Sequence, residues 1–274
     1  MNIEQFADPY VCCRIISVLY GLSIAITCGE KLLYARDYTA NGWLPWKIFR
    51  FDRIHMTVVR RYPRLMDALF GRSGMSVALA MGIGGSALMW ASQPTTWSFT
   101  CGVALTGLVC FFTNVRCLYG GDGSQQMNLI IGVALLLGFN PWVRPAVGTV
   151  CLLFIAAQSG LAYFTSGVSK LVSPIWMRGD PLVGILATRA YGSGFGLRTV
   201  LRLGRFRRVL AIVMVLLETL FPLCVILPRQ GLYAMLLWGV AFHVTNAFIM
   251  GLNTFFWSFI ATYPALCYAW FAVH

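Results

Sequence analysis

Charged residues are scarce in this chain: they make up 11% of its 274 residues, and only nine are acidic against 21 that are basic. Soluble domains carry about a quarter charged residues, so a water-soluble globular domain is excluded. Intrinsic disorder is excluded too, because 58% of the residues are hydrophobic and disordered segments lack such apolar content. The composition predicts an integral membrane protein.

Several motif classes are also missing. The nine cysteines form no C-x-x-C pair and have no nearby histidine pair, so we predict no metal site. The glycine-rich run 191–197 follows no predicted strand, and a dinucleotide-binding loop requires that context. No internal repeat, low-complexity tract or linker divides the chain. We therefore expect a single domain over residues 1–274.

What the chain has instead is a series of apolar runs long enough to cross a bilayer as helices, about 17 to 25 residues each. The runs are continuously apolar and do not alternate, which favours helices over a barrel. The predicted fold class is all-α, a polytopic transmembrane helical bundle of about eight helices with interfacial amphipathic segments. The predicted spans are Tyr10–Tyr34, Gly74–Ala91, Trp97–Val115, Met127–Pro141, Ala146–Gly167, Val209–Leu227, Gly231–Met250 and Asn253–Val273.

The net charge of +12 is concentrated in two stretches, residues 35–73 and 170–208. Basic loops of membrane proteins face the cytoplasm and its anionic lipids. This rule places both stretches in the cytoplasm and both termini outside, in a multi-pass protein of the plasma (inner) membrane. Membrane lipids are therefore the expected partners of the basic residues, and nucleic acid is not expected.

Both basic stretches have the pattern of segments that lie at the membrane surface. Aromatic and basic residues interleave over 43–53, as in amphipathic segments at the headgroups. In 197–209, Arg198, Arg202 and Arg205 share one helical face, and apolar residues occupy another.

A few ionisable and amide groups fall inside the predicted spans, where each costs at least a few kcal/mol. Glu218 lies at the middle of the sixth span, His243 lies within the seventh with Asn246 near it, and Lys170 follows the fifth. Lys170 alone fits a lysine that extends to the membrane boundary, and His243 alone fits an interhelical hydrogen bond. Together these groups indicate a polar intramembrane cavity, which serves acid–base chemistry or proton-coupled transport.

The stretch 158–171, QSGLAYFTSGVSKL, followed by Trp176 and Gly179, resembles the core motif of vitamin K-dependent gamma-glutamyl carboxylases. It also resembles their bacterial relatives, the horizontally transferred transmembrane (HTTM) family. A second block from Phe242 to Pro264 is similar to the family's histidine-bearing helix and its successor. The resemblance covers residues 97–264, and the single-domain form resembles stand-alone bacterial members, including those that mature secreted sporulation-delaying-type peptide toxins.

The resemblance implies a lysine base that acts on a reduced quinone, a vitamin K hydroquinone-like cofactor, with O₂ and CO₂ as co-substrates. Lys170 matches that lysine. The carboxylases work on the lumenal side, whereas the positive-inside rule places Lys170 at the cytoplasmic face. The resemblance gives as candidate catalytic residues Lys170, His243 and Glu218, and as candidate cofactor-binding residues Gln158, Tyr163, Trp176, Asn246, Gln126 and Asp122.

Three functions follow from these patterns. The first is a membrane enzyme of the carboxylase-like HTTM family that uses Lys170 on a reduced quinone or a membrane-associated peptide. The second is a non-catalytic membrane subunit for maturation or export of a secreted peptide toxin, with a small companion protein as partner. The third is a proton-coupled transporter that uses Glu218 and His243, although no inverted repeat is evident.

Overall fold

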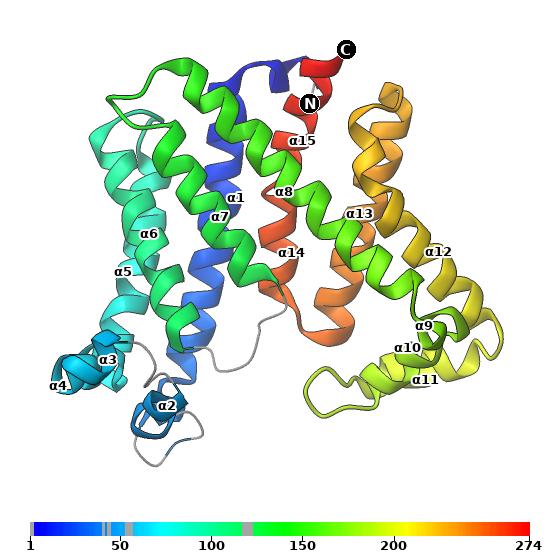
Figure 1. Ribbon diagram of the computed structural model, residues 1–274, viewed down its shortest axis with the longest axis horizontal. Coiled ribbons are helices and arrows are strands. Elements are labelled where there is room, and N and C mark those ends of the chain that lie inside the picture. Colours follow the sequence, from blue (N-terminus) through cyan, green and yellow to red (C-terminus); the bar gives the residue numbers. More distant parts are fainter. Residues whose placement is uncertain (1–2, 40–41, 43–44, 53–56, 117–122) are drawn as a thin grey trace. The chain divides into compact units, whose positions relative to one another are not determined.

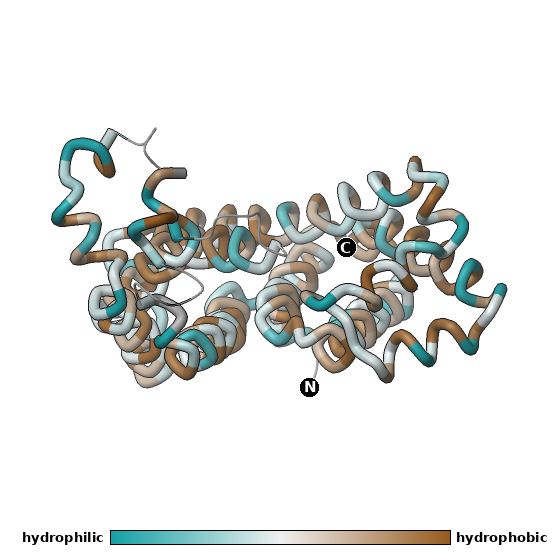
Figure 2. The backbone as a smooth tube through the Cα atoms, turned by 90° about the horizontal axis from the view of Figure 1, so that it is seen from below, coloured by the Kyte–Doolittle hydropathy of each residue, from teal (hydrophilic) through white to brown (hydrophobic). Residues whose placement is uncertain are grey.

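The computed structural model describes residues 3–39, 42, 45–52, 57–116 and 123–274, which Figure 1 traces as ribbons. Within these residues the regular structure is α-helix and 3₁₀-helix, and there is no strand. The prediction of an all-α helical bundle is confirmed. Hydrophobic residues dominate the long helices in Figure 2, as expected of segments whose backbone polar groups are satisfied internally.

Among the residues that the structure describes, seven helical segments are long and apolar enough to cross a membrane, so the protein is a multi-pass membrane protein. The predicted fourth span is the exception, because α7 (Ser124–Gly138) has only 15 residues. At about 1.5 Å per residue it is shorter than the hydrocarbon core of about 30 Å. The seven segments are Pro9–Leu33, Arg72–Ala91, Trp97–Arg116, Pro145–Leu171, Phe206–Val225, Arg229–Met250 and Asn253–Val273.

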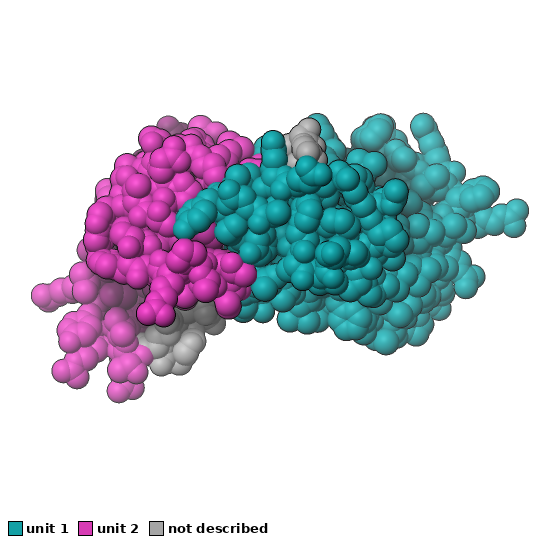
Figure 3. Space-filling view, turned by 90° about the horizontal axis from the view of Figure 1, so that it is seen from above, with its two compact units in different colours: residues 1–12, 152–274 teal, residues 13–151 magenta. Residues whose placement is uncertain are grey.

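The chain forms two compact units, coloured separately in Figure 3. Unit 1 comprises Met1–Cys12 and Leu152–His274, and unit 2 comprises Cys13–Cys151. The unit boundaries therefore fall inside two long helices, α1 (Pro9–Leu33) and α8 (Pro145–Leu171). Each unit is described separately below.

Unit 2 contains most of α1 together with α5, α6 and α7. Helices α5 (Arg72–Ala91) and α6 (Trp97–Arg116) pack against each other, and small residues allow a close approach of their backbones. A Cβ built on Gly85 would lie 2.9 Å from Leu105 Cβ and 3.0 Å from the carbonyl oxygen of Gly102. This pair of glycines sets the distance between α5 and α6.

Polar side chains of unit 2 bond to other helices of the same unit. The Arg14 guanidinium of α1 donates to backbone carbonyls at the end of α5, including that of Ser92 at 2.7 Å. The Asn128 amide of α7 donates to the Ser23 hydroxyl at 2.9 Å. These bonds supply the partners that lipid cannot offer.

The described part of the first basic stretch includes the short helices α2 (Trp46–Asp52), α3 (Thr57–Arg61) and α4 (Pro63–Phe70). Trp46 is buried and stacks on Phe70, and Arg50 pairs with Asp67 at 2.8 Å. Phe51 is exposed. The segment is amphipathic as predicted, but Trp46 packs inside the unit.

Unit 1 contains the rest of the chain. Its elements are η1 (Ile3–Ala7), the larger part of α8, α9 (Pro174–Arg178), α10 (Asp180–Leu186), α11 (Gly194–Arg202), α12 (Phe206–Leu220), η3 (Phe221–Val225), α13 (Arg229–Met250), α14 (Asn253–Ile260) and α15 (Tyr263–Val273). η1 packs against α15, and the ends of the chain carry the labels N and C in Figure 1.

Prolines interrupt two of the predicted spans in unit 1. Pro222 stands four residues after Glu218, so α12 changes to the 3₁₀-helix η3 and the Phe221 N–H bonds to the Glu218 carbonyl. Pro264 likewise follows the break between α14 and α15. Proline lacks the N–H and clashes with the carbonyl four residues earlier, which explains both breaks.

Two further boundaries differ from the sequence prediction. Helix α8 continues to Leu171, four residues beyond the predicted end of the fifth span at Gly167, and Lys170 lies in its last turn. Helix α11 ends at Arg202, and Gly204 has a positive φ of 51°. Arg205 therefore does not share a helical face with Arg198 and Arg202.

The contact of α5 with α6 predicts that substituting valine for two adjacent glycines, Gly84 and Gly85, lowers the stability of the protein by different amounts. Gly85→Val is expected to lower the stability by about 1–3 kcal/mol, because the added atoms overlap α6. Gly84→Val is the matched control, since no atom lies within 4 Å of a Cβ built there. Thermal unfolding midpoints of the detergent-purified protein measure the effect, and equal midpoints for the two variants would contradict this packing.

Candidate functional site

The polar residues of α8 lie along one face of that helix. Ser159, Tyr163, Ser166 and Lys170 are spaced by four, three and four residues, and residues at these spacings face the same direction in an α-helix. The polar stripe, defined as these four residues, runs from the middle of the span to its end. Ser159, Tyr163 and Lys170 hydrogen-bond to other helices or helix breaks of unit 1.

The strongest interaction is an ion pair between α8 and α12. Lys170 Nζ lies 2.7 Å and 2.6 Å from the two carboxylate oxygens of Glu218. The Lys170 side chain is 18% exposed and that of Glu218 only 2%. The Ser166 side chain also interacts electrostatically with Glu218, so residues from two turns of α8 act on the buried carboxylate.

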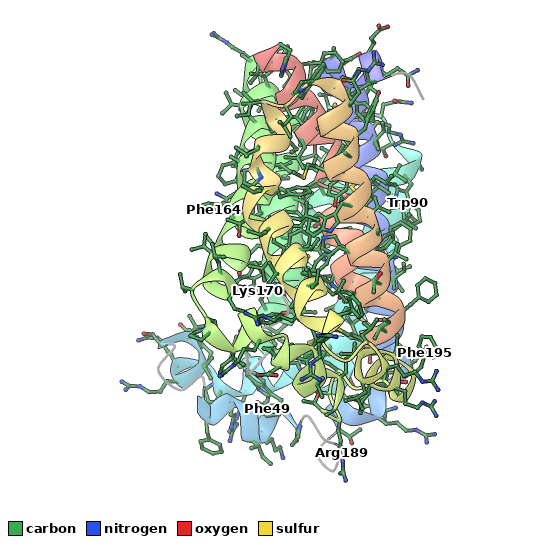
Figure 4. All side chains as sticks on the ribbon, turned by 90° about the vertical axis from the view of Figure 1, so that its right-hand side faces the viewer. Phe49, Trp90, Phe164, Lys170, Arg189 and Phe195 are labelled. Atoms are coloured by element: carbon green, nitrogen blue, oxygen red, sulfur yellow. The ribbon has the colours of Figure 1, made fainter. Side chains whose placement is uncertain are left out.

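An aromatic ring completes this ion-pair cluster, defined as Lys170, Glu218, Ser166 and Trp176. Lys170 Nζ lies 5.2 Å from the centre of the Trp176 ring, which belongs to α9. A cation over an aromatic face is stabilised by the quadrupole of the ring. Arg208 of α12 donates from Nε to the Met177 carbonyl at 3.0 Å, and this bond ties α9 to α12. Figure 4 labels Lys170 at this part of the unit.

A glycine determines how closely α8 and α12 approach. A Cβ on Gly167 would overlap the backbone nitrogen of Thr219, so the two helices are in backbone contact one turn before Lys170. Close crossings of this kind occur at small residues in membrane helices. Gly167 thereby brings Lys170 within reach of Glu218.

His243 belongs to a second group, the histidine cluster, which consists of His243, Tyr163 and Tyr263. His243 is fully buried and its Nε2 hydrogen-bonds to the Tyr163 hydroxyl. The Tyr163 hydroxyl also bonds to that of Tyr263, at 2.9 Å. Within the described residues, His243 Nδ1 is buried without a hydrogen-bond partner.

The histidine cluster is enclosed by aromatic rings. The His243 ring stacks on Phe259 at a centroid distance of 4.9 Å, and Tyr163 stacks on Phe221 at 3.8 Å. Tyr163 precedes Lys170 by seven residues, about 10 Å along a helix axis. The predicted catalytic residues therefore fall into two clusters on one helix face, with Lys170 and Glu218 in direct contact and His243 bonded elsewhere.

The other predicted cofactor-binding residues are more scattered. Gln158 and Asn246 are half-buried, and neither side chain hydrogen-bonds within the described residues. Gln126 is exposed on α7, which belongs to unit 2. Asp122 lies outside the described residues. The ion-pair cluster contains only Trp176 from this predicted set, and the histidine cluster contains only Tyr163.

Sequence reasoning missed Ser159, Ser166, Thr262 and Tyr263. Ser159 and Thr262 share a hydrogen bond of 2.8 Å at the break between α14 and α15. The helical spacing of Ser159, Tyr163, Ser166 and Lys170 was the available signal for the two serines. No local signal existed for Thr262 and Tyr263, because their role depends on which helix lies opposite.

An apolar groove of about 670 Å³ lies elsewhere in unit 1, between α8, η3 and α15. Its lining runs along α8 from Leu153 to Phe164 and includes Pro222 and Leu266, but neither Lys170 nor Glu218 belongs to it. Phe164, labelled in Figure 4, marks the end of the groove nearest Lys170 on α8. The groove offers apolar surface and no reactive group.

Within the described residues, no group of three or more His, Cys, Asp or Glu side chains is placed to hold a metal ion. No protein-family model, curated protein or solved structure matches the chain. A half-buried amine against a buried carboxylate can exchange a proton without a change in the net charge of the pair, which avoids the cost of an unpaired charge in a low-dielectric medium.

The ion pair makes a prediction for protein stability. Lys170→Met is expected to lower the thermal unfolding midpoint strongly, by the equivalent of about 3 kcal/mol, because it leaves the buried Glu218 without its partner. Glu218→Met is expected to cost less, since Lys170 is partly exposed. The double variant removes both charges and is expected to recover most of the loss. Additive losses in the double variant would show that the two groups do not interact.

Proposed function

We propose that the protein is a membrane enzyme that uses Lys170 as an intramembrane base. The observation that carries the proposal is the direct contact of Lys170 Nζ with both Glu218 oxygens, inside spans that face lipid. Maintaining ionisable groups there is costly, and such groups mark functional sites. The partial exposure of Lys170 leaves its amine open to a substrate.

The two residues of the pair have different roles in this proposal. Glu218 accepts a proton from the Lys170 ammonium, and the neutral amine then removes a proton from the substrate. The pair carries no net charge before or after the internal transfer, so this step adds no charge to the hydrocarbon region. Ser166 adds a favourable interaction to the ionised Glu218 carboxylate. General base catalysis of this kind contributes about 10²–10⁴-fold in rate.

A reduced quinone is the cofactor we propose, in line with the resemblance to the carboxylase-like HTTM family. When bound, it would supply an acidic phenolic hydroxyl and react onward with O₂ and CO₂. The residues present fit such a group: Lys170 offers a base, Trp176 offers an aromatic face beside it, and the neighbouring helix surface is apolar. A membrane-associated peptide is the substrate class that this proposal expects.

The role of Lys170 is tested by the consumption of a reduced naphthoquinone in proteoliposomes under oxygen. Lys170→Ala and Lys170→Arg are expected to reduce the rate by at least about 10²-fold, because neither supplies a neutral amine at that position. Lys47→Ala is the control, since Lys47 is an exposed lysine of unit 2. Full activity in both Lys170 variants would refute the assignment.

We further propose that both termini face outward across the plasma (inner) membrane. The contact of η1 with α15 supports a common side for the two ends of the chain, and the positive-inside rule favours the outer side. An even number of crossings is then required, and α7 supplies the eighth by local thinning of the bilayer. The basic residues of 170–208 would face the cytoplasm.

This orientation is tested with reporter fusions. Alkaline phosphatase, which is active only outside the cytoplasm, is expected to be active when fused after His274 and inactive when inserted between Arg189 and Tyr191. The opposite pattern would reverse the orientation and place Lys170 at the outer face.

A further inference from the structure

The segment between the spans of α8 and α12 concentrates the positive charge of unit 1. We call residues 174–209, from α9 to the first turn of α12, the arginine hairpin. It contains seven arginines and a single acidic residue, Asp180. Because α8 and α12 are membrane spans, a segment that joins them lies at the membrane boundary.

Only part of this charge is neutralised inside the unit. Asp180 pairs with Arg178 at 3.4 Å and with Arg207 at 3.6 Å. Arg198 donates only to the Gly194 carbonyl, at 2.9 Å. Across the described part of the chain, no acidic side chain forms an ion pair with Arg189, Arg198, Arg202 or Arg205. These four arginines therefore form an exposed cationic surface.

Large apolar side chains are exposed beside these arginines. Phe195, Leu201 and Phe206 are 69%, 51% and 68% exposed. On α11, Phe195 precedes Arg198 by three residues and Leu201 follows it by three, so they flank it on the outward face. Figure 2 shows hydrophilic and hydrophobic residues alternating along the hairpin. Arginine beside exposed aromatic and aliphatic groups is the composition of helices that lie in the headgroup region.

The opposite face of α11 is fixed to the unit. A Cβ on Gly196 would lie 2.5 Å from Ile249 of α13 and 3.4 Å from Leu186 of α10, and Val200 is buried. The Ser193 hydroxyl accepts the Gly196 N–H at 3.1 Å and caps the helix. Arg198 and Arg202 are therefore held on the outward face of a fixed helix. Figure 4 labels Arg189 and Phe195 at the same end of the unit, beyond Lys170.

From these observations we infer that the arginine hairpin binds the phosphate groups of anionic phospholipids in the adjacent leaflet. The four arginines without acidic partners supply the charge, and Phe195, Leu201 and Phe206 insert among the acyl chains. A soluble anion would use the arginines but would leave the apolar groups in water. The inference is independent of the reaction proposed for Lys170.

The test is lipid retention by the full-length protein, reconstituted with equal amounts of phosphatidylglycerol and phosphatidylcholine and released into native mass spectrometry. Each basic residue near an anionic surface changes binding by about five-fold. Wild type is expected to retain phosphatidylglycerol preferentially, and Arg202→Gln to lower that preference several-fold. The matched control is Arg229→Gln, which removes one exposed arginine of the same unit outside the hairpin.

Two further measurements distinguish lipid binding from binding of a free anion and from a general effect of net charge. Arg202→Lys is expected to keep most of the preference for phosphatidylglycerol, because attraction between opposite charges does not require the planar, two-pronged geometry of a guanidinium group. Replacing chloride with inorganic phosphate at constant ionic strength is expected to leave it unchanged. Loss of the phosphatidylglycerol preference in phosphate buffer would show that the arginines bind a free anion. Equal effects of Arg202→Gln and Arg229→Gln would show that the preference depends only on the net charge of the protein. Either result overturns the inference.

Discussion

A polar side chain inside a membrane finds no hydrogen-bond partner in lipid, and this constraint accounts for the polar contacts of both units. Glu218 illustrates it most fully, because both oxygens of its buried carboxylate accept hydrogen bonds from Lys170. Arg14 meets the same constraint with backbone carbonyls at the end of α5. Each of these contacts fixes one helix against another, so the polar groups that cost most to bury also align the helices.

Glycine and proline make the ion pair geometrically feasible. Gly167 lets the α8 backbone touch that of α12 at Thr219, which shortens the distance that Lys170 must reach. Pro222 then ends the regular helix four residues after Glu218. The carboxylate therefore lies in the last regular turn of α12, where the Glu218 carbonyl is bonded by Phe221 in the tighter 3₁₀ pattern.

The separation of the two polar clusters shapes the proposed chemistry. Lys170 and Glu218 are in contact and partly accessible, whereas His243 is fully buried among Tyr163, Phe255 and Phe259. An imidazole enclosed in this way reaches a substrate only through its tyrosine partners. In the proposed enzyme, the reactive amine and its proton acceptor therefore belong to the ion-pair cluster, and the histidine cluster organises α8, α13 and α15 around it.

The sequence by itself determined the fold class and the approximate membrane spans, because whether a segment is stable in lipid depends mainly on the hydropathy of its own residues. It also identified Lys170, Glu218 and His243 as the costly residues. Only the tertiary structure decided their partners, since Lys170 bonds to Glu218 and His243 to Tyr163 through helix crossings that no local pattern encodes. The same reason applies to Tyr263 and Thr262, which became part of the polar network only when α15 and its preceding break were placed opposite α8.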